Sequence, residues 1–159
     1  MPHSQLPNAT ADQPSVVPLF RHRPVPSSAH VMTLSVANRG RHQAIQRLEV
    51  LEHRIRYYRG NVLHPDWINE YIDLGLDLAD NAQQQHLCAL QESWLKRIYL
   101  TLRDTAFCPD CSEGWRQQCL EFLYQPFFAL QHVYRAQSDG RSKIRALFKD
   151  LSLLTRYVM

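Results

Sequence analysis

The sequence contains few glycines and no long apolar run. Only 5 of its 159 residues are glycine, which is little turn material for a protein built of many short strands and therefore favours helices. It has no apolar stretch long enough for a transmembrane helix, and its first residues lack the apolar run of a signal peptide. We therefore expect a cytoplasmic protein that does not bind membranes.

The motifs of several enzyme classes are also missing. The sequence has no glycine-rich phosphate loop, no Gly-x-Ser-x-Gly nucleophile elbow and no His-Glu-x-x-His zinc motif. The pattern assigns no pair of acid and base, and no activated nucleophile. An enzyme is the class that the sequence favours least.

The charge of the chain is mildly basic, with a formal net charge of +3. This is well below the dense positive charge that drives non-specific nucleic-acid binding, so we do not expect a nucleic-acid partner. The most basic region lies between residues 39 and 59, where the arginines do not align on one helical stripe. That favours a solvated helix, with an RNA-binding regulator as a third alternative. These arginines are Arg39, Arg41, Arg47, Arg54, Arg56 and Arg59.

Prolines divide the chain into two parts. Six of the nine prolines fall before residue 27, among Ser, Gln and His, and no apolar periodicity accompanies them. We therefore expect residues 1–37 to form a disordered Pro-rich arm and residues 38–159 to form one helical bundle domain. Met32 opens a stretch that soon becomes periodic, so translation from Met32 instead of Met1 is an alternative.

Apolar residues recur at helical spacing through the rest of the chain. The expected helices cover residues 41–59, a segment starting at 65–66, residues 83–107, a segment starting at 112 and a last segment starting at 142. Pro126 removes one hydrogen bond from the fourth helix, so a kink or break is expected near Tyr124. Short connections favour antiparallel neighbours. The fold class is therefore all-α, an antiparallel bundle of about five helices.

The four cysteines include one closely spaced pair, Cys108-Pro-Asp-Cys111, between two expected helices. Two thiolates at this spacing can bind a metal ion or form a redox couple, although both can also be ordinary turn residues. A zinc site needs four ligands, and Cys88 would lie about 30 Å away along the helix, while Cys119 has the spacing of a core residue. We expect no cofactor, with a transition metal at Cys108 and Cys111 as the alternative.

Two further features are candidates for binding a partner. The second expected helix carries a stripe of carboxylates, Asp66, Glu70, Asp73, Asp77 and Asp80. The stripe lacks the Glu-x-x-His pairs of a di-iron bundle, so it is either a solvated face or a docking surface for a basic partner. Around Pro126 aromatic residues are dense, and they either fill the core or line a groove for a partner helix. The candidate partner-binding residues are Glu70, Asp73, Asp77, Phe127 and Phe128.

Three segments resemble the FagA family, small helical bacterial proteins of Fur-regulated operons that also carry fumarase and manganese superoxide dismutase. They are His64-Pro-Asp-Trp-Ile-Asn-Glu-Tyr-Ile-Asp-Leu-Gly, the stretch from Trp94 to Asp104-Thr-Ala, and Trp115-Arg-Gln-Gln-Cys-Leu followed by Pro126. The resemblance covers about residues 62–130, and the Pro-rich arm and the Cys108–Cys111 turn lie outside its pattern. It implies a bacterial protein with a role during iron limitation, and it assigns no catalytic residues.

Together these features predict a small accessory or regulatory protein without enzymatic activity. It would act by binding an unknown protein partner in the response to iron limitation or oxidative stress, and a homo-oligomer is compatible with the pattern. The alternative is a metal-binding or thiol-redox protein that uses Cys108 and Cys111.

Overall fold

The protein is an all-α bundle. The computed structural model describes residues 28–158, with side chains from residue 38 to residue 156. This part of the chain forms helices and no strands, which confirms the expected fold class. The helices are α1 (Ser28–Tyr57), α2 (Pro65–Gln84), α3 (Cys88–Phe107), α4 (Glu113–Phe122), α5 (Tyr124–Arg135) and α6 (Gly140–Val158).

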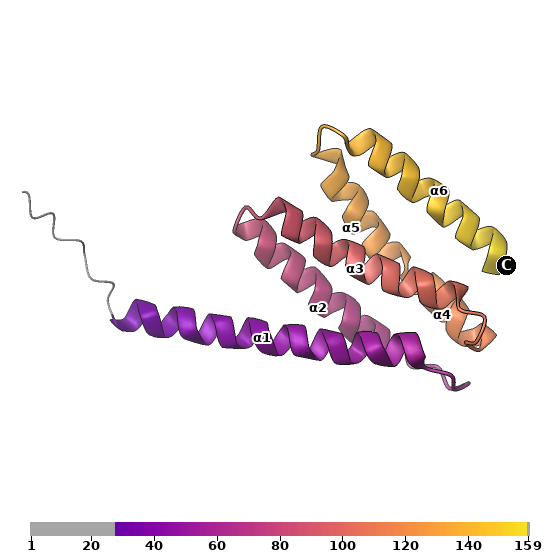
Figure 1. Cartoon of the computed structure of the whole chain (residues 1–159), viewed down its shortest axis with the longest axis horizontal. Helices are drawn as coiled ribbons and strands as arrows, with labels where there is room; N and C mark the ends of the chain where they lie inside the picture. The colour runs from indigo at the N-terminus through magenta and orange to yellow at the C-terminus, as the bar shows by residue number, and fades with distance from the viewer. Residues whose placement is uncertain (1–27, 159) are drawn as a thin grey trace, which may run out of the picture.

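Helices joined by turns run antiparallel to each other, as Figure 1 shows. Helix α1 lies along one edge of the bundle and α6 along the opposite edge, and the first half of α1 extends beyond the other helices (Figure 1). Helix α3 lies between them and packs against all the other helices. Within the described residues, no helix combines the length and apolar character that a membrane-spanning segment needs.

Helix α1 begins earlier than the sequence pattern indicated. Its backbone is helical from Ser28, so the disordered arm expected for residues 1–37 does not include residues 28–37. No proline occurs between residues 27 and 64, and without proline the helix can continue toward the N-terminus. Residues 1–27, the rest of the expected arm, lie outside the described part of the chain.

The boundary between α2 and α3 also differs from the expected one. The third helix was expected from Gln83, but α2 continues to Gln84 and α3 begins at Cys88. His86 has a left-handed φ of 58°, and its N–H donates to the Gln83 carbonyl while the Leu87 N–H donates to the Ala82 carbonyl. These are the two hydrogen bonds of a Schellman motif, which usually has glycine at the left-handed position. Because histidine occupies that position, the sequence lacked the glycine that usually marks such a helix end.

The expected interruption near Tyr124 is present. Helix α4 ends at Phe122 and α5 begins at Tyr124, so Pro126 falls in the first turn of α5, where no hydrogen bond from its nitrogen is needed. The Phe127 N–H donates to the Leu123 carbonyl across the junction. Helices α4 and α5 are therefore the two halves of the helix that was expected to be kinked.

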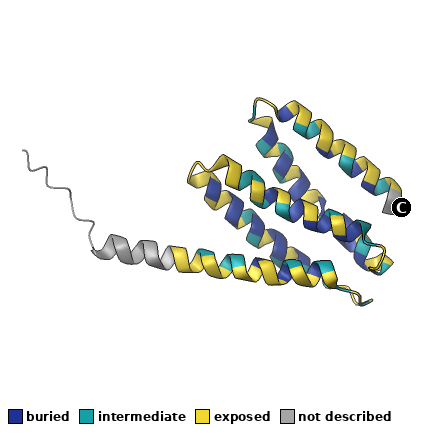
Figure 2. Cartoon of the chain, viewed as in Figure 1, coloured by how far each residue is buried: buried dark blue, intermediate teal, exposed yellow. Residues whose placement is uncertain are grey.

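The core is continuous through the bundle (Figure 2). Its largest fully buried side chains are Trp115, Tyr71, Phe127, Leu48, Leu51, Ile55, Ile68, Ile72, Ile98, Leu102, Leu123 and Leu130. Helices α2 and α3 pack closely because Gly75 has no side chain. A Cβ atom at Gly75 would overlap with the Cδ1 and Cγ1 atoms of Ile98.

A chain of polar contacts joins α1, α2 and α3 beside this core. Glu52 of α1 accepts hydrogen bonds from Arg56 at 3.2 Å and from Arg97 of α3 at 2.6 Å. Arg56 also donates to the Thr101 hydroxyl, which accepts a second hydrogen bond from the Tyr71 hydroxyl, each at 3.0 Å. Burial raises the pKa of Tyr71, so this phenol stays protonated and remains a donor.

Glu92 connects α3 to the α5–α6 turn and to α6. Its carboxylate lies 2.6 Å from the Lys96 Nζ atom and 3.3 Å from the Lys143 Nζ atom, and it accepts a hydrogen bond from the Gln137 amide at 3.0 Å. Burial alone would raise the pKa of Glu92, but these three donors outweigh it and lower the pKa to about 2. The carboxylate is therefore charged wherever the bundle is folded near neutral pH.

We expect Gly75→Ala to destabilise the protein. Alanine gains about 1 kcal/mol of helix propensity over glycine, but forcing Ile98 out of its position in a packed core costs about 1–3 kcal/mol. The net result should be a lower free energy of unfolding, measured by urea denaturation followed by circular dichroism.

Gly40→Ala is the matched control, because Gly40 is exposed in α1 and no atom lies within 4 Å of the added Cβ. This variant should be as stable as the original chain or more stable by up to about 1 kcal/mol. If Gly75→Ala stabilised the protein as much as Gly40→Ala, the close packing of α2 on α3 would be refuted.

Candidate thiol site

The Cys108–Cys111 pair forms a tight turn between α3 and α4. Cys108 is the C-cap residue of α3, and the Cys111 N–H donates to the Cys108 carbonyl at 3.2 Å. A four-residue turn of this kind keeps its end Cα atoms within about 7 Å, which overlaps the range of about 4.4–6.8 Å that a disulfide requires. Both thiols are free in this structure.

The two thiols differ in exposure and in pKa. Burial would raise the pKa of Cys108, but hydrogen bonds from the Cys111 side chain and from the backbone of Asp110 and Cys111, with the charge of Arg59, lower it below its ordinary value. Burial, together with the hydrogen bond and charge of Cys108, raises the pKa of Cys111 to about 11. Cys108 is thus the thiol that ionises first, and the one S–H of Cys111 stabilises its thiolate by turning to it as a hydrogen-bond donor.

Helix α1 ends beside this turn and holds Cys111 in place. The Arg59 guanidinium donates to the Cys111 sulfur at 3.3 Å and to the backbone carbonyls of Arg56 and Tyr58. While Cys108 is protonated, the Cys111 thiol donates to the Tyr58 carbonyl, 3.6 Å away. The Ser112 hydroxyl donates to the Gly60 carbonyl. The turn is therefore fixed to the segment that links α1 and α2.

An aromatic cluster lies under the turn. The rings of His64 and Trp67 stack with centroids 3.9 Å apart, and Tyr58 packs edge-on against Trp67 and Trp115. The Trp115 indole donates to the Ile55 carbonyl at 3.2 Å. Because Trp115 follows Cys111 by one helical turn, a change at the thiols should alter tryptophan fluorescence.

Cys108 also opens onto a small surface hollow. This hollow has a volume of about 200 Å³ and is lined by Arg56, Tyr57, Asp104, Thr105 and Cys108. Cys108 is partly exposed there, whereas Cys111 is buried. A reactant in solution can therefore reach the first sulfur but not the second.

The remaining cysteines, Cys88 and Cys119, lie away from the turn and differ in exposure. Cys88 is exposed at the other end of α3, and Cys119 is fully buried in α4, as its spacing predicted. Burial raises the pKa of Cys119, and the nearby charge of Cys111 raises it further. In the part of the chain that the structure describes, no group of three or more His, Cys, Asp or Glu side chains is arranged to hold a metal ion. Cys108 and Cys111 remain the two possible ligands of the metal alternative.

The acidic stripe on α2 is only partly available to a partner. Arg47 binds Glu70 through two hydrogen bonds of 2.6 and 2.7 Å, so this predicted partner-binding residue pairs with α1. Asp73 and Asp77 are exposed, and neither forms an ion pair among the described residues.

The two aromatic candidates on α5 have different positions. Phe127 is buried, with 1% of its surface exposed, because it faces the core next to Leu123 and Leu130. It therefore offers no surface to a partner, contrary to the sequence expectation. Phe128 is 58% exposed, and it remains a candidate contact residue.

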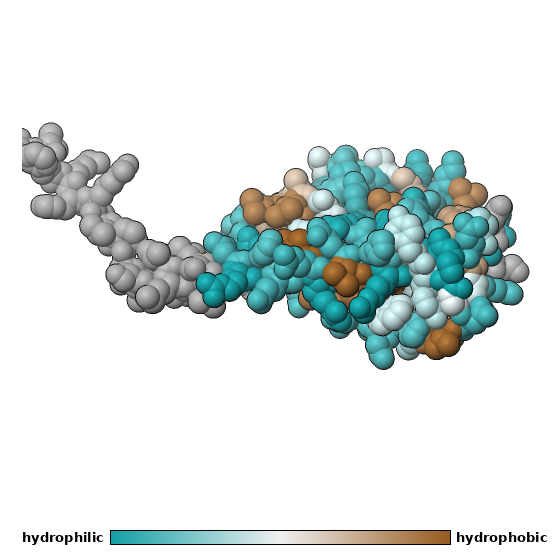
Figure 3. Space-filling view, turned by 60° about the horizontal axis from the view of Figure 1, so that its bottom comes forward, coloured by the Kyte–Doolittle hydropathy of each residue, from teal (hydrophilic) through white to brown (hydrophobic). Residues whose placement is uncertain are grey.

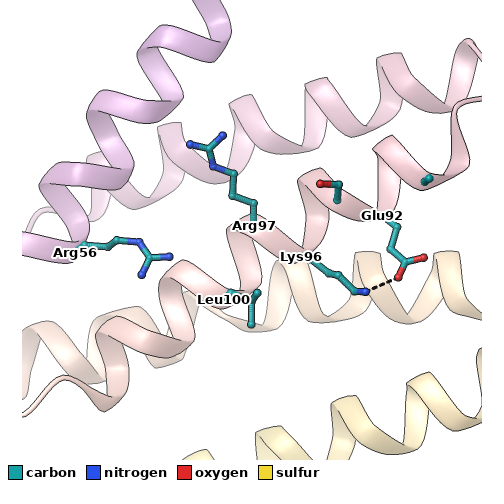
Figure 4. Close-up of a pocket in the computed structure, with 7 residues that line it drawn as sticks. Arg56, Glu92, Lys96, Arg97 and Leu100 are labelled. Carbon is teal, nitrogen blue, oxygen red and sulfur yellow. Dashed lines mark ion pairs between the residues drawn. The ribbon is translucent and has the colours of Figure 1, made fainter.

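A broad hollow on the surface lies along α3 (Figure 4). It has a volume of about 650 Å³, and its labelled charged side chains come from α1 and α3, with Lys96 pointing to Glu92 (Figure 4). Arg56 and Arg97 both bind Glu52, so these charges already have partners within the protein. The face in Figure 3 is mostly hydrophilic, with its hydrophobic residues in separate groups. Neither feature provides a set of reactive groups comparable to the thiol turn.

No known family model matches the chain, and no match was found among the curated proteins or the solved structures. The resemblance to the FagA family therefore remains an expectation from the sequence.

We expect the alkylation rate of Cys108 to depend on Cys111. Only the thiolate reacts with iodoacetamide, so the lowered pKa of Cys108 should place the midpoint of its rate–pH profile below that of an unperturbed thiol. Cys111→Ala removes the hydrogen-bond donor and should move the midpoint to higher pH, as measured by mass spectrometry of the alkylated peptides.

Cys111→Ser tests the cause of this shift, because a serine hydroxyl can still donate a hydrogen bond to Cys108. This variant should keep the midpoint closer to that of the original chain than Cys111→Ala does. An identical midpoint in all three proteins would show that Cys111 does not stabilise the Cys108 thiolate.

Proposed function

We propose that this protein is a thiol-based redox protein in which Cys108 and Cys111 alternate between a dithiol and a disulfide. The observation that carries the proposal is the hydrogen-bonded turn that joins a partly exposed thiol of lowered pKa to a buried thiol of raised pKa. A reactive cysteine is expected to be ionised and accessible, next to a resolving cysteine. This was the alternative function in the sequence analysis.

The reaction is thiol–disulfide exchange with a disulfide of a small molecule or a protein. The Cys108 thiolate attacks one sulfur of that disulfide, forming a mixed disulfide and releasing the other sulfur as a thiolate. Cys111 then loses its proton to solvent and attacks the Cys108 sulfur, which forms the Cys108–Cys111 bond and releases the second thiolate. Two electrons pass from the cysteine pair to the disulfide, which becomes two thiols once protonated.

Oxidation would change the interactions at the end of α1. Cys111 would lose the hydrogen that it donates to the Tyr58 carbonyl, and its sulfur would become a weaker acceptor for Arg59. Both groups belong to the segment between α1 and α2, which packs on the aromatic cluster. A change of oxidation state at the turn would thereby alter the contacts at the end of α1. A redox-active turn fits a role in oxidative stress better than a purely structural turn does.

Metal binding at the same pair is the competing chemistry. Two thiolates supply half of the four ligands that a structural zinc site uses, and the described residues add no third protein ligand of a usual kind. Arg59 at the Cys111 sulfur also favours a thiol or thiolate over a bound cation, because its positive charge would repel a metal ion. We therefore rank the redox function first.

We expect the reduced protein to form the Cys108–Cys111 disulfide in a glutathione redox buffer. Peptide mapping should show a loss of two hydrogen atoms in the peptide that contains both cysteines, and Trp fluorescence should change in parallel. Elemental analysis of the same reduced sample measures bound metal.

The controls separate this pair from the other cysteines. Cys108→Ser and Cys111→Ser should each prevent the bond, whereas Cys88→Ser should leave it unchanged because Cys88 lies at the other end of α3. A protein that stays fully reduced under oxidising glutathione would refute the redox function, and near-stoichiometric metal lost in the Cys108→Ser, Cys111→Ser double variant would favour the metal function.

A second candidate function is protein–protein interaction, which the sequence analysis favoured. Its support is the exposure of Asp73 and Asp77 on α2 and of Phe128 on α5. An accessory role during iron limitation is part of this candidate, on the strength of the resemblance alone.

We expect a protein partner, if one binds the acidic stripe, to be lost when Asp73 and Asp77 are both changed to Lys. Quantitative mass spectrometry of proteins captured by the original chain and by the double variant measures this. The control is Glu113→Lys and Glu121→Lys on α4, which makes the same change in net charge elsewhere. Equal capture by all three proteins would remove the acidic stripe as a docking surface.

A further inference from the structure

The last two helices are strongly basic, as are α1 and the residues that directly follow it. The segment from residue 124 to residue 158 contains six basic residues and two acidic ones, a net charge of +4, whereas the whole chain has a net charge of +3. Of the two acidic residues, Asp150 binds Tyr99 and Arg103 of α3, and Asp139 pairs with Lys143. The remaining basic residues are Arg135, Arg141, Arg145, Lys149 and Arg156.

Four of these basic residues form a stripe along α6, which we call the cationic stripe: Arg141, Arg145, Lys149 and Arg156. Their spacings of four, four and seven residues place them on one face of the helix. All four are exposed, and among the described residues none of them forms an ion pair or a side-chain hydrogen bond. Cations one turn apart on a helix are separated by about 6 Å along its axis.

The arginines of α1 have a different role, although the sequence marked that region as the most basic. Five of the six contact groups within the protein: Arg41 binds Asn81, Arg47 binds Glu70, Arg54 lies over the Trp67 ring, Arg56 binds Glu52, and Arg59 caps the end of α1. Among the described residues, the cations available to an external ligand are therefore mainly those of α6.

Helices α5 and α6 also carry exposed aromatic rings. Phe148 of α6 is 45% exposed and packs edge-on against Phe127 of α5 with centroids 5.0 Å apart. Phe128 also packs edge-on against Phe127, with centroids 5.3 Å apart, and Tyr124 stacks with Phe128 at 6.4 Å. Tyr124, Phe128 and Phe148 thus form one aromatic patch across α5 and α6, supported by the buried ring of Phe127.

We propose that the α5–α6 face, formed by the cationic stripe and the aromatic patch, binds single-stranded nucleic acid. Proteins that bind single strands without sequence preference place basic side chains along the phosphates and aromatic rings under the bases. This face provides both kinds of group on adjacent helices, and the two carboxylates of the segment, Asp139 and Asp150, are already paired within the protein. The proposal departs from the sequence expectation, which considered the net charge of the chain and the arginines of residues 39–59 but not the basic residues of α6.

The same surface is less suited to a membrane. An amphipathic helix binds a lipid surface by burying its apolar side, but the apolar side of α6 faces the protein core, with Leu147, Leu151 and Leu154 buried. An acidic protein could pair with the cations, but its carboxylates would not stack on the exposed rings of the patch as bases do.

The test is the binding of a fluorescein-labelled oligouridylate of about 15 nucleotides to the full, reduced chain, followed by fluorescence anisotropy at several salt concentrations. We expect affinity that falls steeply with salt, because phosphate binding releases counterions. Arg145→Gln with Lys149→Gln should weaken binding about tenfold at low salt and reduce the slope of log affinity against log salt by about 1.4, since each phosphate that is no longer neutralised lowers the slope by about 0.7.

Two further variants test whether the oligouridylate binds at the α5–α6 face. Arg39→Glu removes the same two units of charge from α1 and should leave the salt slope unchanged. Phe128→Ala removes a ring that is mostly exposed, so it should preserve the circular dichroism spectrum, weaken binding and leave the salt slope as it was.

Three results would overturn the proposal. The first is no binding at low salt, and the second is equal weakening by Arg39→Glu and by the Arg145, Lys149 double variant. The third is binding to vesicles of one-third phosphatidylserine, or to a duplex of the same length, at least as tight as to the single strand. None of these outcomes bears on the redox function, because that function depends on Cys108 and Cys111.

Discussion

Helix α3 determines the arrangement of the bundle, because it is the only described helix that packs against all the others. Its contact with α2 is close only because Gly75 leaves room for Ile98. Polar contacts then fix its neighbours in register: Arg97 binds Glu52 of α1, and Glu92 binds Lys143 of α6. With α3 held on several sides, the position of each of its ends is also determined, and the thiol turn is attached to one of them.

The thiol turn acquires its chemistry from this attachment. A Cys-x-x-Cys sequence in a flexible loop would expose two similar thiols. Here the second cysteine packs against the end of α1, where it contacts the Tyr58 carbonyl and Arg59. One thiol is thereby buried with a raised pKa, and the other is accessible with a lowered pKa. The difference between two identical side chains comes from packing, and under the proposed redox function it makes Cys108 the attacking and Cys111 the resolving cysteine.

The position of each basic side chain likewise decides whether it is paired within the protein or available to a ligand. Arginines in α1 that look free in the sequence are paired in the structure, as Arg47 with Glu70 and Arg56 with Glu52. These pairs hold α1 to its neighbours and leave little charge for a ligand. Helix α6 lies at the opposite edge of the bundle (Figure 1), and the four cations of its outer face have no carboxylate partner among the described residues. The distribution of partners, rather than the number of basic residues, therefore decides which face can attract an anion.

The sequence by itself determined the helices, the break before Pro126, the burial of Cys119 and the presence of a thiol pair in a turn. These are local properties, set by the period of the apolar residues, by the missing N–H of proline and by spacing along the chain. It misplaced the start of α3 because His86 takes the left-handed position that glycine usually marks, and it could not separate Phe127 from Phe128. Only the tertiary structure decided which of these neighbours is buried, which arginines are paired and which thiol ionises first, because each depends on residues far away in the sequence that folding brings into contact.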